Sequence, residues 1–126
     1  MRRFCLLVAT LVVLGAAPAL AVGNGSTYVA HLEGDNEVPA VQSRAQGQVI
    51  LEVDRDGESI SYKLIASNID DVLQAHIHLG GADVNGPVVA FLFGPSTGVD
   101  NNGVLSRGTI AADDLVGPLA GSLSTN

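Results

Sequence analysis

From Thr27 onward, apolar and polar residues alternate in short segments that turn residues separate. A period of two indicates β-strands, because successive side chains of a strand point to opposite faces. No window shows the apolar spacing of a long amphipathic helix. The alternation predicts strands over residues 27–32, 47–53, 59–67, 73–79, 88–93 and 104–110. We therefore expect an all-β fold, a single antiparallel β-sandwich or barrel with Greek-key-like connections.

The segments between the predicted strands contain typical turn residues. Residues 54–58 read Asp-Arg-Asp-Gly-Glu and predict a hairpin turn, since Asp and Gly tolerate the backbone of tight turns. Residues 94–103 are rich in Gly, Pro, Asp and Asn and predict a loop. Residues 111–116 predict one helical turn. The segment 88–93 is apolar at every position, which predicts a strand covered on two sides or one at the centre of the sandwich.

The predicted strand 73–79 carries His76 and His78 on alternate residues, so both imidazoles should lie on one face. Gln74 shares that face, whereas Ala75 and Ile77 point the other way. We therefore expect the apolar face to be buried and the face that bears the histidines to be exposed.

The chain begins with Met1-Arg2-Arg3, an apolar run from Phe4 to Ala17 and the small residues Ala19 and Ala21. This order is typical of a secretory signal peptide, and it predicts cleavage after Ala21. We expect residues 1–21 to be a signal peptide, 22–26 a flexible leader and 27–126 one β domain. The apolar run is shorter than the roughly 18 residues that a spanning helix needs, so no membrane insertion is expected after cleavage. The protein should be secreted or held in the periplasm or cell envelope.

Composition narrows the classes of partner. Removing 21 of 126 residues leaves 105, enough for one small domain, and takes away Cys5, the single cysteine. An exported chain without cysteine folds without disulfides. Without Arg2 and Arg3, four Lys and Arg remain against 13 Asp and Glu. Such a surface repels nucleic acid and anionic lipid.

An ordered set of motifs resembles the CHRD domain, a family named for chordin. The motifs are Glu37-Val38-Pro39, Ala75-His76-Ile77-His78 and Asn85-Gly86-Pro87-Val88-Val89, within a match from Thr27 to about Leu119. The resemblance implies an extracellular β-rich module, and the family is regarded as having no settled biochemical activity. Typical members continue past a Gly-Pro-Leu like that at residues 117–119 into further strands. We therefore expect this domain to lack its C-terminal end, which would leave an open sheet edge for another chain.

Two hypotheses for function follow. The first is a non-catalytic, extracytoplasmic binding or interaction module whose partner is another protein. No nucleophile elbow or phosphate loop occurs in the sequence, so metal-dependent redox chemistry is the one enzymatic interpretation left open.

The second hypothesis is a metal-binding protein that uses His76 and His78. Nitrogen ligands without thiolate favour copper or zinc as the ion. Two ligands hold a metal weakly, so His31 and Glu37 are candidate completing ligands, with Asp35 and Asp83 as alternatives. A structural interpretation stands beside this one, in which the histidines bond to loop backbone and orient the turn at Asn85-Gly86.

Overall fold

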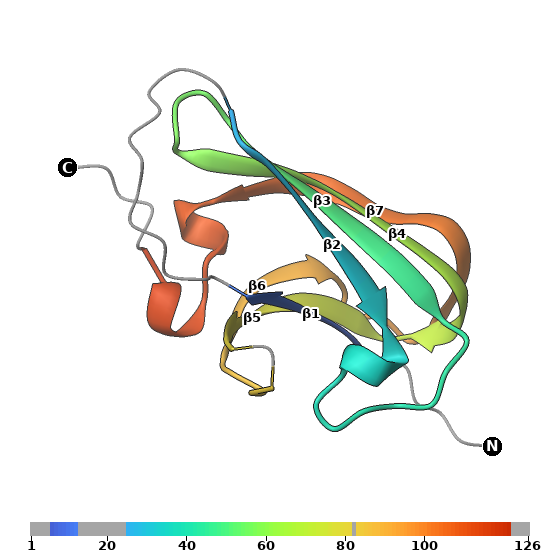
Figure 1. Cartoon of the computed structure of the whole chain (residues 1–126). Coiled ribbons are helices and arrows are strands. Elements are labelled where there is room, and N and C mark those ends of the chain that lie inside the picture. The colour runs from blue at the N-terminus through green and yellow to red at the C-terminus, as the bar shows by residue number, and fades with distance from the viewer. Residues whose placement is uncertain (1–5, 13–24, 82, 122–126) are drawn as a thin grey trace.

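The computed structural model describes residues 6–12, 25–81 and 83–121, and it is a β-sandwich of two sheets (Figure 1). One sheet has four strands in the order β2-β3-β4-β7, and the other has three in the order β1-β5-β6. The strands are β1 (Leu6–Val12), β2 (Thr27–Glu33), β3 (Gln46–Val53), β4 (Ser59–Val72), β5 (Gln74–Gly80), β6 (Val88–Phe93) and β7 (Val99–Ala111). Short 3-10 helices span Gly34–Asn36, Ala112–Asp114 and Gly117–Leu119.

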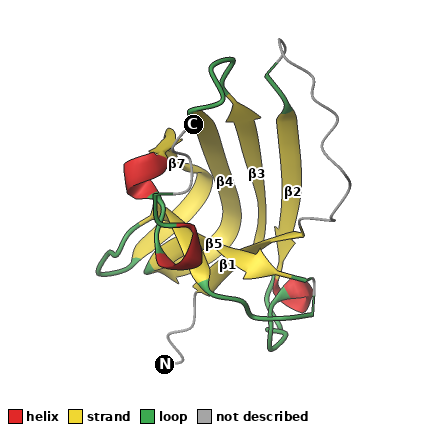
Figure 2. Ribbon diagram, turned by 90° about the vertical axis from the view of Figure 1, so that its left-hand side faces the viewer, coloured by secondary structure: helices red, strands yellow, loops and turns green. Residues whose placement is uncertain are grey.

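The predicted all-β class is confirmed. Strands β2, β3, β4 and β7 pair antiparallel, as do β5 and β6. The chain leaves the larger sheet after β4, forms β5 and β6 in the smaller one, and returns so that β7 pairs with β4, which is a Greek-key-like connection. Figure 2 shows β2, β3 and β4 side by side, with β5 and β1 in front of them.

Two strands are longer than the alternation predicts. Strand β4 continues to Val72 and β7 begins at Val99, inside the segment expected to be a loop. The pairing of β4 with β7 shifts register at three places, and Asn68 and Asp71 there have positive φ values of 55°. Such bulges break the period of two while the ladder continues, because Asn and Asp tolerate this backbone region. The Asn101 side-chain amide also donates to the Ala66 carbonyl at 2.8 Å.

The hydrophobic core lies between the two sheets. Leu64, Ala66 and Val72 of the larger sheet are fully buried, and Ala75 and Leu92 of the smaller one are 1% and 2% exposed. All five belong to one cluster of buried residues. Burial of these alternating apolar positions is the main force that holds the sheets together.

Hydrogen bonds from side-chain hydroxyls to a main-chain carbonyl also join the sheets. The Tyr62 hydroxyl of β4 donates to the Leu92 carbonyl of β6 at 2.9 Å, and the Ser106 hydroxyl of β7 donates to the same oxygen at 2.7 Å. These bonds satisfy a carbonyl on an edge strand, and they fix β6 relative to the larger sheet.

Strand β6 is covered less completely than its apolar sequence predicts. Val89 and Ala90 are buried, but Phe91 is 44% exposed. The segment after the second 3-10 helix lies along β6, where the Val116 amide donates to the Val89 carbonyl at 2.9 Å. That segment supplies backbone partners to a strand at the edge of its sheet.

Candidate functional site

The candidate site lies on β5, the central strand of the smaller sheet. Strand β5 pairs with β1 on one side and β6 on the other. Ala75 and Ile77 belong to the core cluster between the sheets. Because side chains alternate along a strand, His76 and His78 lie on the opposite, outer face of this sheet, as the sequence predicted.

The expectation that this face is exposed was wrong. His76 is 4% exposed and His78 is 6% exposed, so both imidazoles are buried. The physical reason is that β5 is the central strand of its sheet. The aromatic ring of β6 and the loop after β5 also contact the two imidazoles. Sequence alternation places side chains on a face, but it does not report what covers that face.

The two imidazole rings touch each other. Their centroids are 4.6 Å apart, and the rings meet edge to face with an angle of 67° between their planes. Phe91 of β6 packs edge to face on His76, with centroids 5.8 Å apart. An aromatic cluster of this kind orients both rings.

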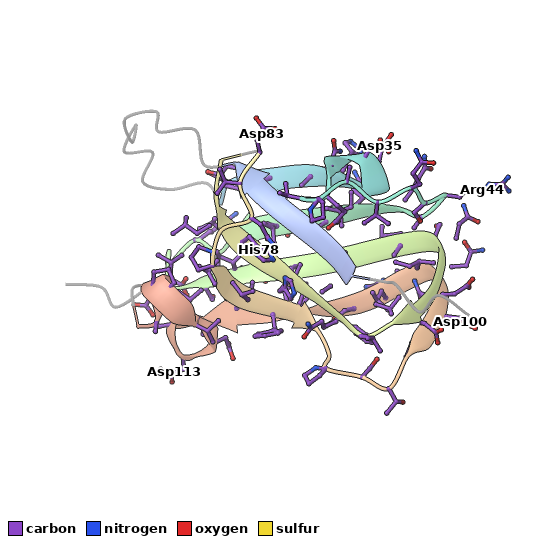
Figure 3. All side chains as sticks on the ribbon, turned by 90° about the horizontal axis from the view of Figure 1, so that it is seen from below. Asp35, Arg44, His78, Asp83, Asp100 and Asp113 are labelled. Atoms are coloured by element: carbon purple, nitrogen blue, oxygen red, sulfur yellow. The ribbon has the colours of Figure 1, made fainter. Side chains whose placement is uncertain are left out.

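The loop between β5 and β6 orients His78. Its Nδ1 is hydrogen-bonded to the Gly86 carbonyl, and Figure 3 labels the His78 side chain. A carbonyl only accepts, so Nδ1 carries the proton, and in the neutral ring Nε2 then keeps its lone pair. This contact matches the structural interpretation in which the pair orients the Asn85-Gly86 turn.

Gly86 fits at this place because it has no Cβ. An added Cβ would lie 1.7 Å from the Leu79 carbonyl oxygen. The loop closes against the end of β5, where the Leu79 amide donates to the Pro87 carbonyl at 3.0 Å. The close approach of two backbone segments therefore sets the position of the Gly86 carbonyl that His78 meets.

Burial changes the acid–base behaviour of His76. The pKa of His76 is lowered from 6.5, first because burial disfavours the charged ring and second because His78 lies beside it. A lowered pKa keeps the His76 imidazole neutral at pH 7. A neutral imidazole offers a nitrogen lone pair, as a metal ligand or hydrogen-bond acceptor must.

Each ring also has a buried nitrogen without a hydrogen-bond partner in the described part of the chain. These atoms are Nδ1 of His76 and Nε2 of His78. Buried polar atoms in native proteins are ordinarily paired with protein or solvent. The two nitrogens are therefore the points on this face at which a proton donor or a cation would be stabilised.

The other predicted ligands lie elsewhere. His31 is exposed on β2 in the other sheet, and Glu37 is half-buried after the first 3-10 helix. Asp35 and Asp83 are exposed, in that 3-10 helix and in the β5–β6 loop (Figure 3). Among the described residues, no three His, Cys, Asp or Glu side chains form a group that could hold a metal ion. The structure brings together His76 and His78, and it does not add the completing ligands.

The edge of β5 away from β6 is paired with a strand that the sequence analysis did not predict. Strand β1 runs parallel to β5, in register from Leu6 opposite Gln74 to Val12 opposite Gly80. This segment falls inside the predicted signal peptide. The predicted cleavage point after Ala21 and residues 22–24 of the predicted leader lie outside the described residues. A signal for β1 exists, since Leu6–Val12 is apolar apart from Thr10 and contains the β-branched residues Val8, Thr10 and Val12, but its composition fits an export signal equally well.

No helix in the described part of the chain is long and apolar enough to cross a membrane.

Comparison with known proteins returns one family. A family model described as the CHRD domain matches residues 28–126. Neither the curated proteins nor the solved structures include a significant match.

Proposed function

The chain belongs to the CHRD domain family, and from this premise we propose that it is an exported, non-catalytic binding module whose β5 edge accepts an extended strand from a partner protein. The partner is an extracytoplasmic protein that presents an apolar segment of about seven residues. Its binding mode is β-strand addition, in which main-chain hydrogen bonds supply affinity and alternate side chains supply specificity.

The observation that carries the proposal is the pairing of β1 with β5. The β5 edge holds a strand of seven residues in unbroken parallel register. By contrast, β5 pairs with β6 through a ladder that shifts register at two places. The edge that β1 covers is thus the more regular side of β5.

Export would open this edge. The segment Leu6–Val12 lies within the residues that the sequence predicts to be removed. Its loss would leave the outward N–H and C=O groups of Gln74–Gly80 unpaired, beside the buried core residues Ala75 and Ile77. Unpaired groups at an apolar edge are a template for another strand, and a partner strand would restore what cleavage removes.

A peptide titration tests the proposal. The protein is recovered after export from a host with a secretion pathway, and mass spectrometry establishes whether it begins at Val22. A synthetic peptide with the sequence of Leu6–Val12 and a solubilising lysine tail is then added, and the amide resonances of β5 are followed by NMR. We expect saturable shifts in Gln74–Gly80. The matched controls are two forms of the same peptide, one N-methylated at the odd-numbered residues and the other at the even-numbered residues. The form whose methyl groups lie on the edge that faces β5 cannot form the ladder.

Two results would contradict the proposal. One is an exported chain that retains residues 1–21, because its edge is then never open. The other is a peptide that leaves the β5 resonances unchanged, or one whose two N-methylated forms both produce the same shifts.

A second candidate function is metal binding by His76 and His78. The specific observation in its favour is the pair of buried ring nitrogens, Nδ1 of His76 and Nε2 of His78, that no described residue bonds. Copper and zinc are the ions that neutral imidazoles favour. The test is whether addition of metal raises the midpoint of thermal unfolding, since a ligand that binds the native state stabilises it. If neither copper nor zinc changes the midpoint of thermal unfolding, metal binding by this pair is refuted.

A further inference from the structure

Strand β2 is an edge of the larger sheet, and in the described part of the chain no strand is paired with its outer side. The sheet order is β2-β3-β4-β7, so β2 pairs with β3 alone (Figure 2). Tyr28 and Val29 of this strand are 53% and 51% exposed. An uncovered edge presents a row of backbone N–H and C=O groups that another strand can pair with.

Strand β2 also lacks the features that protect the edges of β6 and β7. The edge of β6 is covered by the segment whose Val116 amide donates to the Val89 carbonyl. Strand β7 pairs with β4 through a ladder with three register shifts, and it carries Asp100 and Arg107. By contrast, β2 pairs with β3 without a shift, contains no Pro or Lys, and has one formally charged residue, Glu33, at its end. Bulges, charges and Pro ordinarily keep an edge from pairing with another chain, so β2 is an edge suited to pairing.

The hydrogen bonds to β3 show which backbone groups of β2 point outward. The Val53 amide donates to the Ser26 carbonyl at 2.9 Å, so these two residues form a hydrogen-bonded pair. Such pairs alternate along an antiparallel ladder, so the even-numbered residues of β2 bond to β3 and the odd-numbered ones direct their groups outward. Glu33 is the N-cap of the first 3-10 helix, and its carbonyl accepts the first bond of that helix. The residues of β2 that keep both outward groups open toward the described chain are Thr27, Val29 and His31.

We propose that two copies of this chain pair with each other along β2, antiparallel and in register about Val29. The partner is a second copy of this chain, and the two larger sheets join into one. The proposal goes beyond strand addition at the β5 edge and does not depend on it, since β2 and β5 belong to different sheets.

The register follows from the open groups. Thr27, Val29 and His31 are centred on Val29, so a two-fold axis at Val29 sets Thr27 of each copy opposite His31 of the other. Each opposed pair exchanges two hydrogen bonds, and every open outward group is satisfied. A shift toward Glu33 would instead set Thr27 opposite a carbonyl that the 3-10 helix already uses. The same surface serves both copies, as a two-fold interface requires.

The side chains suit this register. Residues opposite each other in a sheet point to the same face, so the two exposed Val29 side chains would cover each other. On the other face, the exposed Tyr28 ring of each copy would lie beside the half-buried Ala30 of the second copy. The two Glu33 residues lie at opposite ends of the joined strands, so the ladder sets no two carboxylates against each other.

The net charge of the chain gives the pairing a characteristic salt dependence. Two copies of net charge −7 repel each other, and this repulsion is long-ranged. Salt screens it, over about 8 Å at physiological ionic strength, whereas hydrogen bonds between backbone groups are screened far less. The dimer should therefore be tighter in about 0.5 M NaCl than in about 0.05 M NaCl. Association driven by opposite charges would show the reverse dependence.

Sedimentation equilibrium over a range of protein concentrations measures the dissociation constant. The samples are the protein recovered after export and a form kept uncleaved by Ala21→Gln. We expect the mass to rise from one chain to two with concentration in both forms, because β2 lies outside the predicted signal peptide.

Val29→Pro removes the two hydrogen bonds at the two-fold axis and none to β3, because the Val29 N–H points outward and edge strands tolerate Pro. This variant should weaken the dimer roughly 5- to 150-fold, the factor for two hydrogen bonds. The matched control is Val29→Thr, which keeps the N–H and a β-branched side chain and should keep most of the affinity.

Disulfide formation tests the register without reliance on the proline variant. Val29→Cys, in a Cys5→Ser background, places two thiols at the axis. The Cα atoms of a hydrogen-bonded pair lie about 5.5 Å apart, within reach of a disulfide, so mild oxidation should link the two chains. The matched control Thr27→Cys is also at an exposed position, but its two copies lie four residues apart along the strand, roughly 13 Å, and should not cross-link.

Four results would overturn the proposal. One is a mass of a single chain at every concentration. Another is equal affinity in Val29→Pro and Val29→Thr, and a third is a Thr27→Cys variant that cross-links as readily as Val29→Cys. The fourth is association of the exported form without association of the Ala21→Gln form. That outcome would move the contact from β2 to the β5 edge, and it would agree with strand addition there.

Discussion

Replacement of Gly86 by alanine tests whether the β5–β6 loop is held against the histidine strand as the structure describes. A Cβ at residue 86 would lie 1.7 Å from the Leu79 carbonyl oxygen, whereas real Cβ contacts essentially never fall under 3.0 Å. The neighbour is backbone of the central strand, which cannot rotate away as a side chain would. The loop must therefore move away from the end of β5.

The expected cost follows from the contacts that this movement breaks. Three hydrogen bonds depend on the position of the loop: the Leu79 amide to the Pro87 carbonyl, the Gly86 amide to the Val84 carbonyl, and His78 Nδ1 to the Gly86 carbonyl. Each contributes about 0.5 to 1.5 kcal/mol, so the loss of all three would lower the free energy of unfolding by about 1.5 to 4.5 kcal/mol.

The matched control is Gly81→Ala in the same loop. A Cβ at residue 81 meets no atom within 4 Å. Both variants remove the same glycine flexibility from the unfolded chain, an effect of about 0.4 to 1 kcal/mol, so the difference between them isolates the clash. The assay is urea unfolding followed by far-ultraviolet circular dichroism. If Gly86→Ala were as stable as Gly81→Ala to within about 0.5 kcal/mol, the close approach of loop and strand would be refuted.

Further expected outcomes concern the core, the link between the sheets and pH. The pKa of His76 is lowered from 6.5 by burial and by its neighbouring imidazole, so the unfolded chain binds the proton first and stability should fall as pH drops below about 6.5. Urea titrations between about pH 5 and 7 should show a shallower fall in His76→Gln, and an equal fall would contradict this cause. Tyr62→Phe removes a bond to a carbonyl of the opposite sheet, and calorimetry should show a loss of about 0.5 to 1.5 kcal/mol; no loss would mean that the bond does not link the sheets. Leu64→Ala should cost about 2 to 5 kcal/mol in urea unfolding because Leu64 is fully buried. The control variant Val104→Ala, at an exposed position, should change the free energy of unfolding by less than about 0.5 kcal/mol. If both variants lost the same free energy of unfolding, the assignment of Leu64 to the core would be wrong.

The strands could be predicted where one face is buried and the other is polar. The alternation predicts β3 to within one residue, because each side chain of a regular strand reports its face. Strand β6 coincides with the continuous apolar run at 88–93, which predicts a strand by its length and composition. The alternation fails at the ends of β4 and β7, where Asn68 and Asp71 take positive φ and shift the register. There the residues typical of turns occur inside a continuing ladder, so a local pattern cannot separate a bulge from a loop.

The candidate site could be predicted only in part. Alternation placed His76 and His78 on one face of β5, since that follows from local geometry. Their burial could not be predicted, because alternation reports the face of a strand and not what covers that face; the contacts with Phe91 and Gly86 form only when the β5–β6 hairpin folds. Strand β1 was missed because its apolar composition fits an export signal equally well, and its parallel pairing with the distant β5 leaves no local pattern that would decide between the two.

Hydrogen exchange of the β5 amides tests the central claim, that this edge opens on export and accepts a strand. The exported protein is measured before and after addition of the peptide with the sequence of Leu6–Val12, beside the uncleaved Ala21→Gln form. In a sheet, alternate amides of a central strand serve its two neighbours. We predict that the amides of Gln74–Gly80 directed toward β1 exchange fast in the exported protein, become protected with peptide, and are protected throughout in the uncleaved form. Amides directed toward β6 should stay protected in every sample. Full protection of both sets in the exported protein without peptide, or no added protection with it, would contradict the account.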